Sequence, residues 1–288
     1  MKTEIVKIAT LNKVNKYCLS DPIDTSKCAE LLIKYPFNNF ILLDNEMNVI
    51  FGFDFIAYFE QENKKEIEVI IINNDKDALI LAYNYKEKFF GFNTYEKLIF
   101  INKALDFFSI SEIYKKTNID ISINKDLKNN LKYIIDSNFK DSLILGKISL
   151  KTVLELCKWD ENDRELMIKF FSKVSFSKSQ QLNIIEMLEE IMFKEKSNID
   201  TIYNKLNIEN LIEEEKPQKK IIEKIFSYRF PAYQKESDLW EQNIKKLKLP
   251  PNISIAHYPF FEKKDIELKI NLQKAEDIQK IVKFLKTL

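Results

Sequence analysis

The first ninety residues have the hydrophobic pattern of a small sheet with short helices. Short apolar runs predict strands at Glu4–Thr10, Phe40–Leu43, Val49–Phe51 and Ile67–Ile72. Helical spacing predicts helices at Lys27–Lys34, Phe53–Phe59 and Asp75–Tyr85. The first of these helices follows Asp24, Thr25 and Ser26, which are residue types that cap helix N-termini, and Pro36 ends it.

From Asn93 to about Asn210 the pattern changes. Apolar residues now recur every three or four positions, which indicates helices with one buried face. The predicted helices are Thr94–Phe108, Ser109–Lys116, Ser122–Asp136, Lys151–Trp159, Asp163–Val174 and Ser177–Lys194. We expect their apolar stripes to form the core of an all-helical middle domain.

A charged stretch containing Pro217 then marks a domain boundary. Beyond it, the pattern predicts helices Lys219–Phe226 and Glu236–Leu247, strands Ile253–His257 and Ile266–Asn271, and a closing helix Lys274–Leu285. The predicted fold class is therefore α+β. Its parts are a mixed α/β domain (1–90), a helical domain (91–212) and a C-terminal ββα unit (217–288).

The C-terminal unit has more apolar side chains than so small a unit can bury. They include Phe260, Phe261, Ile281, Phe284 and Leu285. Either this unit packs on the preceding helices, or it meets a second copy of itself and makes the protein a homodimer.

Composition narrows the class of protein. The chain is 45% hydrophobic and 31% charged, which is typical of a globular protein. It has no apolar run long enough to cross a bilayer and no signal-peptide pattern, so we expect a cytoplasmic protein without a membrane partner.

Cys18, Cys28 and Cys157 form no CxxC pair and should be reduced thiols. The single histidine, His257, excludes most zinc sites and should be a packing residue at a strand end.

The net charge of +1 predicts no polyanion partner by itself, but the charge is unevenly distributed. Residues 216–288 have 16 Lys and Arg against 9 Asp and Glu, so this part carries +7. Arg164 and Arg229 are the only arginines. Lysine can hold phosphates, but a chain with so little arginine is poorly equipped to contact guanine edges.

Glycine is scarce, and Gly52 stands at a junction between a predicted strand and a predicted helix. Glycine at such a junction lets a phosphate approach the backbone. With only three glycines, neither a GxGxxG nor a Walker motif is present, and Phe53, Asp54 and Phe55 bring no positive charge after Gly52.

Gly52 and three polar residues could still close around a nucleotide. They are Asn84, Lys88 and Glu96. The amide and the lysine would hold phosphates, and the carboxylate would hold magnesium. The alternative is that Glu96 is an acidic residue in the first turn of a helix, where it is stabilising without any ligand.

Two consecutive predicted helices, Ser109–Lys116 and Ser122–Asp136, have the spacing of a helix-turn-helix. The second helix of this motif enters the major groove, where asparagine can contact adenine and lysine can hold phosphate. The candidate DNA-binding residues are Lys115, Lys116, Ser122, Asn124, Lys125, Lys128 and Asn129. Two antiparallel helices of a bundle have the same spacing, so this alternative stays open.

In the order of these parts, the chain resembles the ParB family of chromosome- and plasmid-partition proteins. The similar segments are Leu42–Ile72, Asn84 with Phe92–Lys97, Ser109–Ser122, Leu143–Leu156 and Ile253–Leu285. The resemblance implies an N-terminal domain that binds CTP with magnesium, a helical domain that binds double-stranded DNA, and a C-terminal domain that dimerises. DNA binding would place the protein at the nucleoid.

The family's nucleotide motifs are only partly present. Gly52, Asn84 and Glu96 match, and Lys88 is the basic residue after the asparagine. The family's arginines after the glycine fall on Asp54 and Phe55. We therefore expect a ParB-like DNA-binding protein with a degenerate nucleotide site that keeps no CTP or magnesium and has no catalytic residues. The alternatives are an adaptor for other proteins that has lost both ligands, and a residual CTPase.

Overall fold

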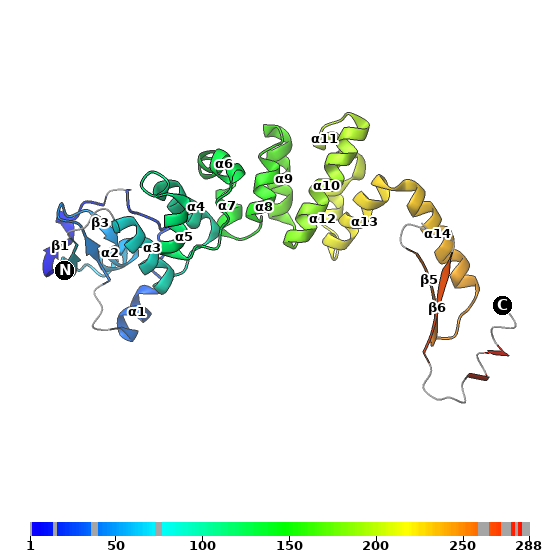
Figure 1. Cartoon of the computed structure of the whole chain (residues 1–288), viewed down its shortest axis with the longest axis horizontal. Coiled ribbons are helices and arrows are strands. Elements are labelled where there is room, and N and C mark those ends of the chain that lie inside the picture. Colours follow the sequence, from blue (N-terminus) through cyan, green and yellow to red (C-terminus); the bar gives the residue numbers. More distant parts are fainter. Residues whose placement is uncertain are drawn as a thin grey trace. The chain divides into compact units, whose positions relative to one another are not determined.

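The computed structural model describes residues 2–13, 16–35, 40–72, 77–258, 265–271, 278–279 and 282–283. Helices dominate, and a small sheet lies in the N-terminal part (Figure 1), so the mixed helix-and-strand class is confirmed. The chain divides into two compact units, Met1–Ile185 and Glu186–Leu288. The three domain ranges expected from the sequence stay a prediction.

The N-terminal sheet contains four short strands. They are β1 (Lys2–Lys7), β2 (Leu42–Leu43), β3 (Val49–Phe51) and β4 (Glu66–Ile71), in the order β1-β4-β2-β3. β4 pairs antiparallel with β1 and parallel with β2, and β2 pairs antiparallel with β3. The first predicted strand is too long, because Ile8–Thr10 form a 3₁₀ helix (η1).

Three helices belong to this part: α1 (Cys28–Lys34), α2 (Phe53–Gln61) and α3 (Ala78–Phe89). The predicted cap of α1 is wrong, because its N-cap residue is Lys27 and no side chain caps it. The Asp24 carboxylate instead accepts a hydrogen bond from the Ser26 N–H, which forms a local turn. The predicted start of α3 and Pro36 lie outside the described residues, and α3 continues past its predicted end at Tyr85.

Every described element from Thr94 to Ile212 is a helix. In the first unit, these helices are α4 (Thr94–Ala104), α5 (Ile110–Thr117), α6 (Lys125–Asp136), α7 (Lys140–Ile144), α8 (Leu150–Leu156), α9 (Glu161–Lys173) and the beginning of α10 (Lys178–Glu195). Side-chain caps start α4, α5, α6, α8 and α9: Asn93, Ser109, Asn124, Ser149 and Asp160 each accept a bond from an N–H in the first turn. The sequence did not predict α7.

The second unit contains the rest of α10, then α11 (Ile199–Leu206), α12 (Ile208–Ile212), α13 (Pro217–Arg229) and α14 (Pro231–Lys246). A hairpin of β5 (Ile253–His257) and β6 (Ile266–Ile270) follows at the predicted residues. The predicted closing helix lies largely outside the described residues, as do Phe260, Phe261, Ile281, Phe284 and Leu285.

Two expectations from composition can be compared with this structure. Within the described ranges, no helix combines the length and the apolar character needed to span a bilayer. Cys18, Cys28 and Cys157 are free thiols, as predicted. Burial raises the pKa of the Cys28 thiol to about 12 and that of Cys157 to about 11, so both are protonated at neutral pH and unsuited to act as nucleophiles.

Candidate functional site

The junction between β3 and α2 depends on Gly52. Its φ of 106° lies in a region that side chains disfavour, and the residue is the N-cap of α2. A Cβ atom here would lie 2.5 Å from the carbonyl oxygen of Phe40 and 2.9 Å from the Ile41 side chain. The close approach that requires this glycine is therefore made by the chain's own backbone.

An anion already occupies the first turn of α2. Asp54 is 1% exposed. One of its carboxylate oxygens accepts a bond from the Ser20 hydroxyl at 2.7 Å, and the other from the Asp24 N–H at 2.9 Å. The N-terminus of a helix stabilises negative charge, so this position favours the Asp54 carboxylate.

A buried ion pair joins α3 to α4. The Lys86 ammonium lies 3.1 Å from the Glu96 carboxylate, and the two residues are 6% and 5% exposed. Lys86 also donates to the Ser20 hydroxyl at 3.1 Å and lies over the rings of Phe90 and Phe92. Through Ser20, the Asp54 carboxylate and this ion pair form one polar cluster.

Both oxygens of Glu96 are engaged. One accepts from the Asn93 N–H in a capping box, and the other from the Asp21 N–H at 3.0 Å in addition to its contact with Lys86. Within the described residues, no group of three or more His, Cys, Asp or Glu side chains is arranged to hold a metal ion. The carboxylate oxygens of Asp54 and Glu96 thus all accept hydrogen bonds or an ion pair from within the protein.

The connecting segment between η1 and α1 (residues 16–27) is held by several helices of the first unit. Beyond its bonds to Asp54 and Glu96, its Asp21 carboxylate forms an ion pair with Lys140 of α7 at 2.9 Å. Its Cys18 carbonyl accepts from Lys103 of α4 at 3.0 Å. This segment therefore links α2, α3, α4 and α7.

The other two candidate nucleotide ligands lie elsewhere on α3. Asn84 is exposed and donates to the Lys116 carbonyl at the end of α5 at 3.3 Å. Lys88 is exposed, and its ammonium lies over the Phe89 ring. Of the four residues, Glu96 is a member of the buried cluster and Gly52 precedes Asp54. Lys86 was not among the predicted site residues, although its spacing from Leu79 and Tyr83 places it on the buried face of α3.

The candidate nucleic-acid interface consists of α5, the turn of residues 118–124, and α6. Ser109 and Glu112 form a capping box at the start of α5, and Asn118 ends it in the left-handed conformation. α6 buries Leu127, Leu131 and Ile134. The hydroxyl of Tyr95 on α4 donates to the carbonyl of Ile135, which fixes the end of α6.

The opposite face of α6 is exposed and basic. Lys125, Lys128, Asn129 and Lys132 all lie on it. Among the described residues, no ion pair involves these three lysines. Asp126 also lies in the exposed first turn of α6 and reduces the positive potential of this surface.

The remaining candidate DNA ligands are also exposed but differ in their contacts. Asn124 caps α6 by accepting from the Leu127 N–H at 2.9 Å, which leaves its amide NH₂ as a donor. Lys116 forms an ion pair with Asp77 at 2.8 Å and lies over the Phe108 ring. Lys115, at the end of α5, and Ser122, in the turn, are exposed.

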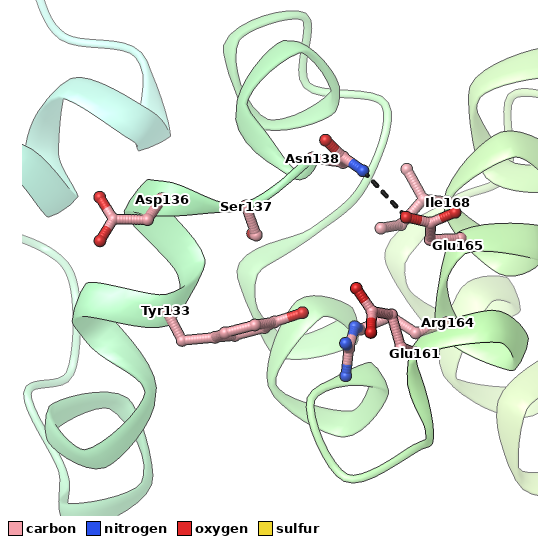
Figure 2. Close-up of a pocket in the computed structure, with 8 residues that line it drawn as sticks. All are labelled: Tyr133, Asp136, Ser137, Asn138, Glu161, Arg164, Glu165 and Ile168. Carbon is pink, nitrogen blue, oxygen red and sulfur yellow. Dashed lines mark hydrogen bonds between the residues drawn. The ribbon is translucent and has the colours of Figure 1, made fainter.

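A small pocket of about 260 Å³ lies beyond the basic face, where α6 meets α9 (Figure 2). The Arg164 guanidinium is stacked 4.8 Å from the Tyr133 ring and donates to the Trp159 carbonyl. Asn138 donates to Glu165 across the pocket. Asp136, Glu161 and Glu165 also line it, so acidic side chains surround the partly buried Arg164 here.

His257 lies at the end of β5, as expected. Its ring packs edge-on against Trp240 of α14 at 5.3 Å, and its Nδ1 contacts the Tyr258 carbonyl. The ring contact is a packing contact between the hairpin and α14.

Among known proteins, this chain is similar to solved structures. No protein-family model matches the chain, and no curated protein matches it. The chain is similar to the C2221 form of a pNOB8-like ParB-N domain, with 14% identity and a TM-score of 0.40 over 77% of this chain and 92% of that one. It is also similar to a second pNOB8-like ParB N-domain structure, with 16% identity and a TM-score of 0.31 over 82% and 96%. Both are ParB N-domains, the family that the sequence motifs resemble.

Proposed function

We propose that this protein is a ParB-like protein that binds double-stranded DNA through α5 and α6 and no longer uses a nucleotide. The exposed basic face of α6 carries the proposal, because it sets Lys125, Lys128 and Lys132 around Asn129 on a helix with a buried opposite side. Lysines at this spacing can neutralise successive phosphates, and an asparagine between them can contact a base edge. A role in chromosome or plasmid partition follows from the family resemblance.

The nucleotide part of the proposal rests on the polar cluster. Asp54 supplies the negative charge at the start of α2, and the Lys86–Glu96 ion pair uses the groups that would otherwise meet phosphate and magnesium. We propose that these internal contacts replace CTP and magnesium, so that the protein binds DNA without either.

Replacing Lys125 and Lys128 together with alanine should weaken DNA binding and lower its salt dependence. Fluorescence anisotropy with a labelled duplex, measured at several salt concentrations, gives the slope of log K against log salt. We expect the slope to fall by about 2, because each lysine that contacts a phosphate contributes about 1.

The matched control replaces Lys65 and Lys88, two exposed lysines outside α5 and α6, with alanine. This variant has the same charge change and should keep the slope of the wild type. Adding CTP and magnesium should leave the affinity unchanged. An equal loss in both variants, or no binding by the wild type at low salt, would refute the proposal.

The hairpin in the second unit supports a homodimer. Ile266 is 57% exposed and Leu268 37% exposed on β6, and Leu239 of α14 is 51% exposed. The hairpin contacts α14 through His257 and Trp240 but leaves these apolar side chains exposed, so we propose that they pack against a second copy of the chain.

Replacing Leu268 with lysine should then convert a dimer to a monomer in sedimentation velocity at micromolar concentration. A buried lysine without a partner opposes association. Phe193→Ser is the control, since Phe193 is 87% exposed on α10 and lies outside the proposed interface. A monomeric wild type, or a dimeric Leu268→Lys variant, would contradict the proposed dimer.

A further inference from the structure

The turn between α5 and α6 differs from the usual helix-turn-helix connection. Residues 118–124 separate the two helices, whereas three or four residues are typical. A longer turn leaves the direction of the second helix less constrained by chain length. Specific contacts must therefore set the position of α6 relative to α5.

Tyr114 of α5 provides such contacts. Its hydroxyl donates to the Ile121 carbonyl at 3.1 Å and accepts from the Ile123 N–H at 2.6 Å. These two bonds close the turn around the exposed Ser122. The side chains of Ile119 and Ile123 are each 5% exposed, so the turn is also anchored in the core.

A second contact holds the same turn from α4. The Lys97 ammonium lies 2.7 Å from the Asp120 carboxylate, and this hydrogen bond holds the pKa of Asp120 below its usual value. Lys97 is mostly buried, whereas Asp120 is largely exposed. The turn is thus fixed to two different helices, just before Asn124 and Lys125 begin α6.

We infer that Tyr114 is a positioning residue for DNA binding, which deepens the proposed function and rests on it. The tyrosine acts through the turn: by fixing Ile121 and Ile123, it sets where Lys125 and Lys128 lie relative to Lys115. Without its hydroxyl, the turn samples several conformations, and DNA must select the one that aligns the lysines. The apparent affinity then falls with the population of that conformation.

The test is Tyr114→Phe in the 288-residue chain, because this change removes both hydrogen bonds and keeps the ring. Duplex binding is measured by fluorescence anisotropy at several salt concentrations. We expect the dissociation constant to rise roughly fivefold, given a loss of about 1 kcal/mol. The salt slope should match the wild type, since no phosphate contact is lost. Amide exchange of Ile123 should become faster in the free protein.

Tyr58→Phe is the control, because it removes a hydroxyl from α2, outside α5 and α6. Asp120→Asn tests the second anchor by amide exchange, where Ile123 should exchange faster; the affinity is no readout for this variant, because losing a negative charge from the turn by itself favours DNA binding. Faster amide exchange of Ile123 with unchanged DNA affinity would mean that the Tyr114 hydrogen bonds stabilise the turn but do not position the lysines for DNA. That result would overturn the inference. A lower slope for Tyr114→Phe would mean that Tyr114 contacts DNA directly, which would also overturn it. A wild type that does not bind DNA at low salt would instead refute the proposed function.

Discussion

Replacing Lys86 with methionine is expected to lower the free energy of unfolding of the first unit by about 3–5 kcal/mol. Methionine keeps most of the length of the side chain but removes the positive charge. Glu96 would then be a carboxylate 5% exposed with no cation at 3.1 Å, and the Ser20 hydroxyl would lose a donor. An uncompensated buried charge is among the costliest defects that one substitution can create.

Urea denaturation followed by circular dichroism measures this effect. The matched control is Lys88→Met on the same helix, which alters an exposed lysine and should change the free energy by less than about 0.5 kcal/mol. Adding Glu96→Gln to Lys86→Met should restore part of the loss, because no buried charge is then left unpaired and the amide oxygen still accepts from one of the two N–H groups, of Asp21 or Asn93. If Lys86→Met and Lys88→Met have similar free energies of unfolding, the Lys86–Glu96 ion pair contributes little to stability.

Replacing Gly52 with alanine should destabilise the same unit by about 2–5 kcal/mol, since backbone strain and overpacking both contribute. The φ of 106° disfavours any side chain, and the added methyl would meet the Phe40 carbonyl at 2.5 Å. Because the obstacle is backbone next to β2, it cannot move aside as a flexible side chain would. Thermal unfolding by calorimetry gives the loss.

Gly91→Ala separates the two contributions. Gly91 also has a positive φ, of 77°, but a Cβ atom there would have no neighbour within 4 Å. Its substitution should cost roughly 1–2 kcal/mol from strain alone. If Gly52→Ala costs no more than Gly91→Ala, the close approach to Phe40 does not matter for stability.

The sequence predicted the elements of the fold better than their roles. Val49–Phe51 was placed correctly because Gly52 ends the strand, and α5 was predicted almost to the residue. α6 was predicted from its apolar stripe, but its start was placed at Ser122, whereas Asn124 caps the helix and Lys125 begins it. α7 was missed because so short a helix contains too few positions to establish a period.

The candidate nucleotide site shows why the roles were harder to predict. The predicted helix ends at Tyr85, which gives neither Lys86 nor Lys88 a helical phase, and Lys88 was named as the basic residue after Asn84. Because α3 extends to Phe89, the spacing from Tyr83 places Lys86 on the buried face of the helix and Lys88 on the exposed face. For Gly52 and Asp54, the decisive partners are Phe40 and Ser20, and sequence periodicity does not reveal contacts between distant segments.

The connecting segment of residues 16–27 also bears on how this protein could have diversified. It comes from the strand-rich beginning of the chain, yet its bonds reach Glu96 at the start of the helical region and Lys140 of α7. A gene fragment encoding only the first ninety residues would lose both partners and leave Lys86 and Asp21 without counter-charges. Recombination that exchanges this sheet alone is therefore disfavoured, and the region up to α7 should be inherited as a single piece.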